Sequence, residues 1–251
     1  MTWFITLLTS LFLVPPPVGG VADYQLGGAY EPDDVVQIVT RDRTDPPAEG
    51  VYNVCYVNAF QTQPGELDWW ESEHPDLLLR EDGDLVIDEG WPDEVILDIS
   101  TADRRTEAAE IVGDWFAQCA DDGYQAVEPD NLDAYTRSRG LLDADDAVAF
   151  AELLVEQAHL HGLAIGQKNS AELLDRPMGF DFAVTEECEV YSECGDYAEA
   201  YGRRVIEIEY TDNGREAYAK ACADRDERGS ILLRDRDVVP ADDPAYVYEW
   251  C

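Results

Sequence analysis

Short apolar runs alternate with amphipathic stretches over most of this chain, and that alternation restricts the folds it can adopt. Strands that alternate with helices favour a parallel sheet wrapped by helices. The predicted helices are residues 106–121, 143–161, 196–202 and 214–225. The predicted strands are residues 23–28, 35–40, 52–59, 94–100, 125–131, 164–169, 182–187, 204–210 and 230–234. The pattern therefore predicts an α/β fold, a (β/α)8 TIM barrel, with one surplus strand that we expect to be an edge or an extension.

The length of 251 residues suits a single barrel domain, which we place at residues 23–251. The clearest helix is the one predicted at residues 143–161, because Asp143 can cap its start and Gly162 can end it. Residues 61–91 show no strong period and are predicted to form a long loop. Long loops with aromatic residues often carry function, so this loop is a candidate part of a site.

Acidic side chains dominate the composition. The chain has 55 Asp and Glu against 17 Lys and Arg, a formal charge of -38 that is spread along its length. Nucleic acid is excluded as a partner, because binding it depends on basic contacts to phosphate. The excess of acids indicates adaptation to salt, since the short Debye length near 1 M salt removes most of the self-repulsion. An acidic protein from an ordinary source is the alternative.

The six cysteines are an even number without the spacing of a zinc ribbon. This favours three disulfides and an oxidising compartment, with free buried thiols in a cytosolic enzyme as the alternative. The pairing that we expect is Cys188 with Cys194, Cys222 with Cys251, and Cys55 with Cys119.

The N-terminal residues 1–14 resemble the apolar part of a secretory signal, although no Lys or Arg precedes them. We expect residues 1–22 to be a signal or targeting segment and the protein to be secreted. The apolar run is too short to span a bilayer comfortably, and no later stretch is apolar enough. The mature protein is therefore expected to have no membrane span, and we expect a monomer.

Two stretches at predicted strand ends run straight from apolar residues into carboxylates, residues 126–131 and 182–188. The carboxyl ends of barrel strands carry catalytic groups, so acids from different strands can face one cleft. A pair of carboxylates is the minimal equipment for cleaving a glycosidic bond. The sequence therefore predicts a glycoside hydrolase. Trp69 and Trp70 in the long loop either stack on sugar rings or pack in the ordinary way.

Period-two alternation decides which side chains share a face of a strand. If the apolar set packs on helices, the polar set faces the barrel axis; the inward residues expected are Asp98, Glu128, Asp130, Lys168, Glu207 and Glu209. At residues 182–187 the rule turns Glu186 outward and favours Glu187, unless a bulge or an early strand end brings Glu186 inward.

So many inward acids cannot all be ionised, because like charges and burial raise their pKa values. Unequal environments would keep one carboxyl protonated as an acid catalyst and another ionised, as glycoside hydrolysis requires. For Asp98, Glu128 and Glu209 the structural alternative is an ion pair with Lys168 or a nearby Arg.

Several short motifs occur in a specific order between residues 23 and 210. They are residues 23–28, 55–58, 97–99, 127–131, 158–163, 168–169, 186–188, 193–194 and 209–210. With this set the chain resembles the endo-α-1,4-polygalactosaminidase family of glycoside hydrolases. The resemblance implies a (β/α)8 barrel with a deep acidic cleft, secretion, and endo-cleavage of α-1,4-linked galactosamine polymers. A neutral or N-acetylated glycan is an alternative substrate.

The same resemblance implies that Asp130 and Glu186 are the catalytic pair. We expect Asp130 to be the nucleophile or base and Glu186 the general acid. The family more often has Asn-Glu-Gln-Cys where this chain has Thr185-Glu186-Glu187-Cys188, so Glu187 is a rival for Glu186. The residues expected to bind substrate are Tyr24, Asp98, Glu128, Asn131, Lys168, Asn169, Glu187 and Glu209.

Other chemistries fit the sequence less well. No metal is expected, because His159 and His161 are two apart on a helix and cannot face one ion. No cofactor is expected, since a glycine-rich phosphate loop is missing. Lys168 at a strand end could form a Schiff base, as in an aldolase, but neighbouring acids would raise its pKa and suit it to charge pairing. A non-catalytic barrel that only binds polysaccharide is the alternative function.

Overall fold

The computed structural model describes residues 13–224 and 229–251. The predicted signal segment, residues 1–22, lies partly outside the described residues, as does the last residue of the helix predicted at 214–225. Within the described residues, no helix combines the length and the apolar character needed to cross a membrane.

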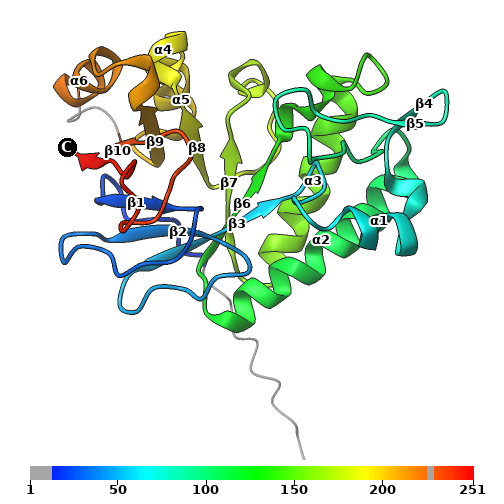
Figure 1. The fold of residues 1–251 in the computed structure, drawn as a ribbon, viewed down its shortest axis with the longest axis horizontal. Coiled ribbons are helices and arrows are strands. Elements are labelled where there is room, and N and C mark those ends of the chain that lie inside the picture. The colour runs from blue at the N-terminus through cyan, green and yellow to red at the C-terminus, as the bar shows by residue number, and fades with distance from the viewer. Residues whose placement is uncertain (1–12, 225–228) are drawn as a thin grey trace, which may run out of the picture.

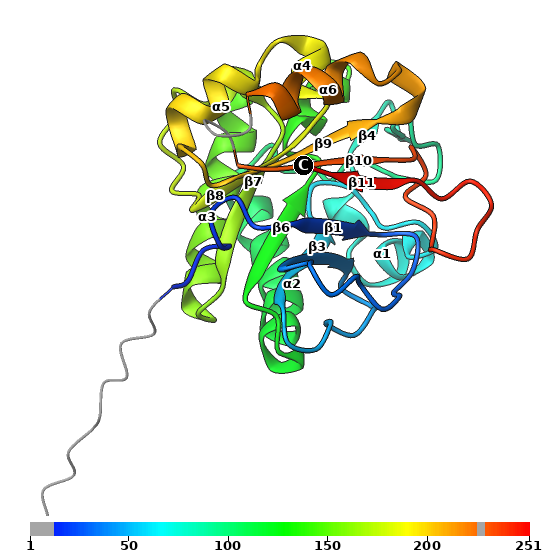
Figure 2. The same cartoon turned by 90° about the vertical axis from the view of Figure 1, so that its left-hand side faces the viewer.

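A nine-stranded sheet curls into a barrel (Figures 1 and 2). Its strands, in spatial order, are β1 (Ala22–Gln25), β2 (Ile38–Asp42), β3 (Tyr52–Asn58), β6 (Ala126–Asp130), β7 (Ala164–Lys168), β8 (Phe182–Glu186), β9 (Val205–Tyr210), β10 (Ser230–Arg234) and β11 (Tyr248–Trp250). Neighbours from β1 to β10 pair in parallel, and β11 pairs antiparallel with β10. The predicted α/β barrel is confirmed.

The barrel closes where β10 and β11 lie next to β1 (Figure 2). Arg234 of β10 lies 3.6 Å from a carboxylate oxygen of Asp23 in β1. The Tyr248 hydroxyl of β11 donates a hydrogen bond of 3.0 Å to the carbonyl of Ala22. Side-chain contacts therefore join the two ends of the parallel set.

Six α-helices occur in the described residues: α1 (Leu67–Glu73), α2 (Ala102–Asp122), α3 (Ala144–Leu160), α4 (Cys188–Tyr191), α5 (Cys194–Tyr201) and α6 (Glu216–Ala223). The long helices α2 and α3 lie side by side against β3, β6 and β7, and α4 to α6 cover β8 to β10 (Figure 1). Asp143 caps α3 by accepting from the amides of Asp145 and Asp146, as predicted. Gly162 follows this helix with a φ of +76°.

The strands carry apolar side chains on both faces of the sheet. One residue set lies inside the barrel and includes Tyr24, Val54, Ala126, Val184 and Ile208. The opposite faces of β3, β6 and β7 pack against α2 and α3 in the largest core cluster. The barrel interior is thus itself apolar beneath the carboxyl ends of the strands. An acidic side chain of a strand therefore points inward only where its strand does not fill the interior with apolar residues at that level.

Residues 94–100 are the surplus strand of the prediction. In the barrel β3 pairs directly with β6, so this segment has no place between them. It instead forms isolated antiparallel bridges to residues 61, 78 and 87. The predicted loop at residues 61–91 is also more ordered than expected, because it contains α1, the 3₁₀ turn η1 (Pro75–Leu77) and the small hairpin of β4 (Arg80–Glu81) and β5 (Asp84–Leu85).

Three disulfides each involve at least one helix. One ties β3 to α2, another joins the starts of α4 and α5, and the third ties α6 to the last residue of the chain. The pairs are those expected: Cys55–Cys119, Cys188–Cys194 and Cys222–Cys251.

Candidate active site

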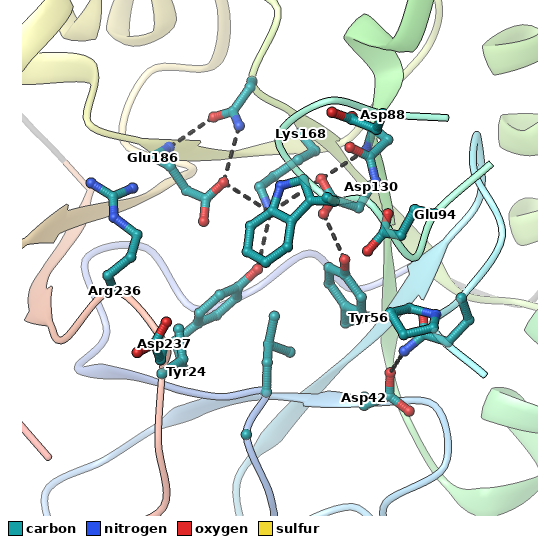
Figure 3. Close-up of a pocket in the computed structure, with 18 of the residues that line it drawn as sticks. Tyr24, Asp42, Tyr56, Asp88, Glu94, Asp130, Lys168, Glu186, Arg236 and Asp237 are labelled. Carbon is teal, nitrogen blue, oxygen red and sulfur yellow. Dashed lines mark hydrogen bonds and ion pairs between the residues drawn. The ribbon is translucent and has the colours of Figure 1, made fainter. Parts of the chain in front are cut away.

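A cleft of about 500 Å³ opens at the carboxyl ends of the barrel strands. Figure 3 shows Asp130 and Glu186 pointing into it from the tips of β6 and β8, with Lys168 of β7 between them. β7 pairs with both of these strands, so its last side chain lies between the last side chains of its neighbours. The sheet topology therefore creates the juxtaposition that the sequence predicted.

Lys168 is the centre of this arrangement and is almost fully buried. Its Nζ lies 2.9 Å from Glu128 and 3.3 Å from both Asp130 and Glu186. Burial alone would lower the Lys168 pKa, but the three carboxylates outweigh it and raise that pKa well above its ordinary value. A permanently charged lysine is a poor Schiff-base nucleophile, which argues against the aldolase alternative.

Asp130 is held in an ionised state by three donors. Tyr56 donates to Oδ2 at 2.6 Å, the Asn131 amide donates to Oδ1 at 2.8 Å, and Lys168 lies 3.3 Å away. Burial pushes the Asp130 pKa upward, but Lys168 and these hydrogen bonds outweigh it, so the pKa is lowered. The carboxylate is therefore both charged and fixed in direction.

Glu186 enters the cleft without a bulge, one of the two features that the sequence analysis expected to bring it inward. Phe182 and Val184 of β8 belong to the apolar interior of the barrel, and Glu186 continues the same face at the strand tip. Its carboxylate accepts from the Tyr210 hydroxyl and from Asn169 Nδ2, the latter at 3.1 Å. Asn169 also accepts from the Glu186 amide at 2.8 Å, so the side chain and its backbone are positioned together.

Glu187 lines the same cleft but is engaged elsewhere. It has a left-handed φ of +62°, which turns the chain out of β8. Arg236 lies 2.6 Å from its carboxylate, and Asn213 donates a further hydrogen bond. The Arg236 hydrogen bond is the main reason that the Glu187 pKa is lowered. Because its carboxylate is bound in this way, Glu187 is better suited to holding Arg236 in place than to donating a proton.

Glu128 and Tyr24 lie beneath the cleft and support Lys168. Tyr24 donates to Glu128 at 2.6 Å, and Lys168 donates to Tyr24 at 3.0 Å. Glu128 is fully buried and its burial raises its pKa, against the opposing effects of Lys168 and Tyr24. Tyr24 lines the cleft, whereas Glu128 acts from the layer below it.

Asn131 and Asn169 also line the cleft, each directly after a strand end. Both have a left-handed φ, +67° and +47°, which Asn tolerates better than most residues. Asn131 donates to Asn58 at 2.9 Å and accepts from Arg137 at 3.0 Å. These asparagines therefore order the rim on either side of the acids.

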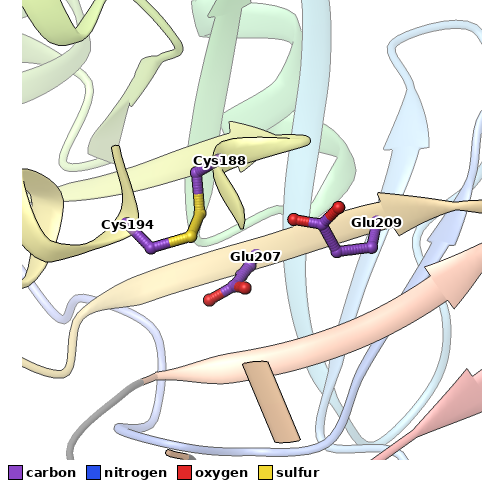
Figure 4. Close-up of side chains that lie close together, drawn as sticks. All are labelled: Cys188, Cys194, Glu207 and Glu209. Carbon is purple, nitrogen blue, oxygen red and sulfur yellow. A yellow bond between two sulfur atoms is a disulfide. The ribbon is translucent and has the colours of Figure 1, made fainter. Parts of the chain in front are cut away.

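Asp98 and Glu209 were predicted to bind substrate, but the structure does not bring them into the cleft. Asp98 accepts from Ser100 and pairs with Arg104 at 2.8 Å, because residues 94–100 lie outside the barrel. Glu209 is directed away from the axis, where it accepts from the Glu189 amide at 3.0 Å. The side chain of Glu207 lies on the same outer face (Figure 4).

The inward direction predicted for Glu207 and Glu209 is thus wrong, for a physical reason. Ile206 and Ile208 of β9 fill the apolar interior, so the acids between them turn outward beneath α4 and α5. There they lie close to Cys188 and Cys194 (Figure 4), but a disulfide uses both thiols, and these sulfurs cannot bind a metal as thiolates.

Sequence reasoning missed several cleft residues because they lie in the predicted loop at residues 61–91 or begin the surplus strand predicted at residues 94–100. Trp91 is 57% exposed and lines the cleft, and Asp88 there pairs with Arg137 at 2.6 Å. Glu94 is nearly buried in the cleft wall and accepts from Asn58 at 2.7 Å. Burial, reinforced by the charges of nearby aspartates, raises the pKa of Glu94 to about 7.

Glu94 should make stability depend on pH. Because its folded-state pKa of about 7 exceeds the ordinary 4.5, the folded protein retains a proton that the unfolded chain releases between these pH values. The free energy of unfolding should therefore fall as pH rises through this window, by about 2 kcal/mol from this group. Urea unfolding of wild type and Glu94→Gln across the window measures the difference. Equal pH dependence in the two proteins would contradict the assignment.

Comparisons relate this geometry to known proteins. The model of glycoside-hydrolase family GH114 matches residues 9–251. The crystal structure of Aspergillus fumigatus Ega3 in complex with galactosamine is similar at a TM-score of 0.71 and 25% identity, over 95% of this chain and 97% of that one. The glycoside hydrolase domain of PelA from Pseudomonas aeruginosa shares the fold at a TM-score of 0.65 and 15% identity, over 90% and 97%. A search of curated proteins finds no match.

Proposed function

The chain belongs to glycoside-hydrolase family GH114. From this premise we propose that the protein cleaves α-1,4-linked galactosamine-containing polysaccharide at internal linkages, with Asp130 and Glu186 as catalytic acids. The observation that carries the proposal is the placement of both carboxylates 3.3 Å from one lysine nitrogen, Lys168 Nζ. Two acids from separate strand tips thus face one cleft, as glycoside hydrolysis requires.

The spacing of the two acids favours a retaining mechanism. Because each has an oxygen 3.3 Å from Lys168 Nζ, those two oxygens are separated by at most twice that distance. Retaining enzymes have carboxyl groups about 5–5.5 Å apart, whereas inverting enzymes need roughly 6.5–9.5 Å to admit a water molecule. The largest possible separation of these two oxygens therefore reaches only the lower edge of the range for inverting enzymes.

The surroundings of the two acids support different roles. Asp130 has the lowered pKa and three donors, which suits the nucleophile that attacks the anomeric carbon. Glu186 is the more exposed of the two, at 26% against 18% of the side chain, and suits proton transfer to the leaving oxygen. Once the glycosyl ester has formed, Glu186 would take the proton of the water that hydrolyses it.

The charge of the cleft supports an amino-sugar substrate. Its walls carry many carboxylates beyond the catalytic pair, and the cations of the described lining are Arg137, Lys168 and Arg236, each already paired with an acid. The acids are Asp42, Asp88, Glu94, Asp133, Glu187 and Asp237. A protonated galactosamine polymer would be concentrated by such a cleft. The similar Ega3 structure contains galactosamine, which supports the same class of ligand.

The test is to incubate the protein with galactosamine oligomers and polymer in high salt and to measure new reducing ends and product lengths. Cleavage within the chain should give a mixture of intermediate lengths before monomer appears. A non-catalytic glycan-binding barrel would instead retain the polymer on a column without shortening it. If Asp130→Asn produced reducing ends as fast as wild type, the proposed chemistry would fail.

We also propose that the protein is secreted, because three disulfides are typical of an oxidising compartment.

The net charge of -38 further leads us to propose that the protein is adapted to salt. Two like charges about 10 Å apart repel by about 0.4 kcal/mol in unscreened water, and the chain contains many such pairs. The free energy of unfolding should therefore rise by several kcal/mol between 0.1 M and 2 M NaCl. Urea unfolding at both salt concentrations measures this. Sucrose, which does not screen charge, is the control, and an equal gain in sucrose would contradict the prediction.

A further inference from the structure

A second pocket of about 280 Å³ is lined by residues that directly follow residues of the catalytic cleft in the sequence. Its lining residues are Arg43, Gly65, Glu66, Trp69 and Trp115. It differs from the cleft in character, because indole rings form much of its wall. No catalytic acid of the cleft contributes to it.

Two chain segments run continuously from the cleft to this pocket. Asp42 lines the cleft and the next residue, Arg43, lines the pocket. Gln63 and Pro64 line the cleft, and the next two residues line the pocket. The segments are joined on the cleft side by a 3.0 Å hydrogen bond from Gln63 to Asp42, and on the pocket side by an ion pair between Arg43 and Glu66. A polymer leaving the cleft along these segments would reach the pocket.

The indoles form a supported platform. Trp69 is 40% exposed, and its ring centroid lies 5.0 Å from that of the fully buried Trp70 and 6.4 Å from that of Trp115. Arg43 covers Trp115, with its guanidinium carbon 4.4 Å from the ring centroid. Trp69 therefore has an open surface on a rigid base, which reduces the entropy cost of binding a ring against it.

The charged side chains of the pocket are Arg43 and Glu66, which pair with each other. One carboxylate oxygen of Glu66 binds Arg43, and the other is buried and, in the part of the chain that the structure describes, has no hydrogen-bond partner. An indole face attracts a ligand cation, and a carboxylate accepts from an ammonium or hydroxyl group. This combination matches a sugar ring that carries a protonated amine.

We propose that the pocket is an outer subsite, in which Trp69, beside the acidic side chain of Glu66, binds an amino-sugar residue of a polymer whose reacting linkage lies in the catalytic cleft. The inference rests on the proposed function of the cleft. It implies that the enzyme prefers long chains, because short oligomers that fill only the cleft cannot reach Trp69.

The experiment compares kcat/KM on short galactosamine oligomers and on long polymer for wild type, Trp69→Ala and Trp250→Ala. Trp250 is also 40% exposed but lies on β11 and does not line either pocket, so it is the matched control. Trp69→Ala should lower kcat/KM on polymer about tenfold, mainly through KM. Its activity on short oligomers should stay unchanged, which also shows that the variant is folded. Trp69→Phe, which keeps an aromatic face, should recover most of the activity on polymer.

The outcomes separate the two proposals. If wild type cleaves polymer but Trp69→Ala keeps the wild-type preference for long chains, or loses activity equally on all lengths, the subsite is overturned and the cleft chemistry stands. If wild type cleaves no length of substrate, the proposed function fails and the subsite fails with it.

Discussion

Asp130→Asn is expected to lower kcat by about 10³-fold or more while leaving the affinity for polymer within a few-fold of wild type. The amide has the shape of the carboxylate and can keep the hydrogen bond with Tyr56 by reversing its direction. It cannot form the glycosyl ester or act as a base, so the loss falls on the chemical step. Reducing-end kinetics measure kcat, and retention on immobilised polymer measures binding.

The matched control is Asp133→Asn, the same substitution at another acid of the cleft. Asp133 is 38% exposed and pairs with Arg137 at 2.7 Å, whereas the ion pairs of Lys168 among the described residues are with Glu128, Asp130 and Glu186. This variant should keep kcat within a few-fold of wild type. Equal losses in the two variants would show that general cleft charge, and not attack by Asp130, limits the reaction.

Lys168→Met should destabilise the fold by about 3–5 kcal/mol. Lys168 is 2% exposed and is 2.9 Å from Glu128, which is fully buried. Removing the lysine leaves that carboxylate without its compensating charge, and an uncompensated buried charge costs about this much. Urea unfolding in high salt measures the change. The double variant Lys168→Met/Glu128→Gln should recover much of the lost stability, because it also removes the buried acid.

Lys220 provides the control for this prediction, since it is the other lysine of the chain. It pairs with Glu189 at 2.7 Å, but its side chain is 63% exposed. Glu189 itself is 2% exposed, but the Lys220 ammonium stays in water, where solvent and salt screen the pair, so Lys220→Met should destabilise the fold less than Lys168→Met does. A loss at Lys168 no larger than the loss at Lys220 would contradict the central role given to the buried lysine.

Local pattern was sufficient for the strands that end in the site, but not for the direction of every acid. The rule that apolar residues face helices worked for β6, where Val127 packs outward and Glu128 and Asp130 turn inward. It failed for β9 and misdirected the reasoning on β8, because Ile208 and Val184 fill the barrel interior. A barrel is apolar on both sides of its sheet at the lower levels, so alternation alone does not identify the inner face.

The wall of the cleft was beyond sequence reasoning for another reason. Residues 94–100 have the composition of a strand, but β3 takes β6 as its partner and leaves them at the rim. Glu94 and Trp91 thus reach the cleft through tertiary pairing that no local period encodes. The pairing of β6 with β3 places this segment at the rim, near the proposed catalytic residue Asp130.

Glu128 and Asp130 share the ammonium group of Lys168, and the charge of Asp130 is one of the causes that raise the Glu128 pKa, so these two acids titrate together. Groups coupled in this way lose protons in macroscopic steps that belong to the whole set. Neutralising either of these two acids will therefore displace the inflection of the pH–rate profile attributed to the other, so that the pair and its shared lysine together govern the acidity at which the enzyme works.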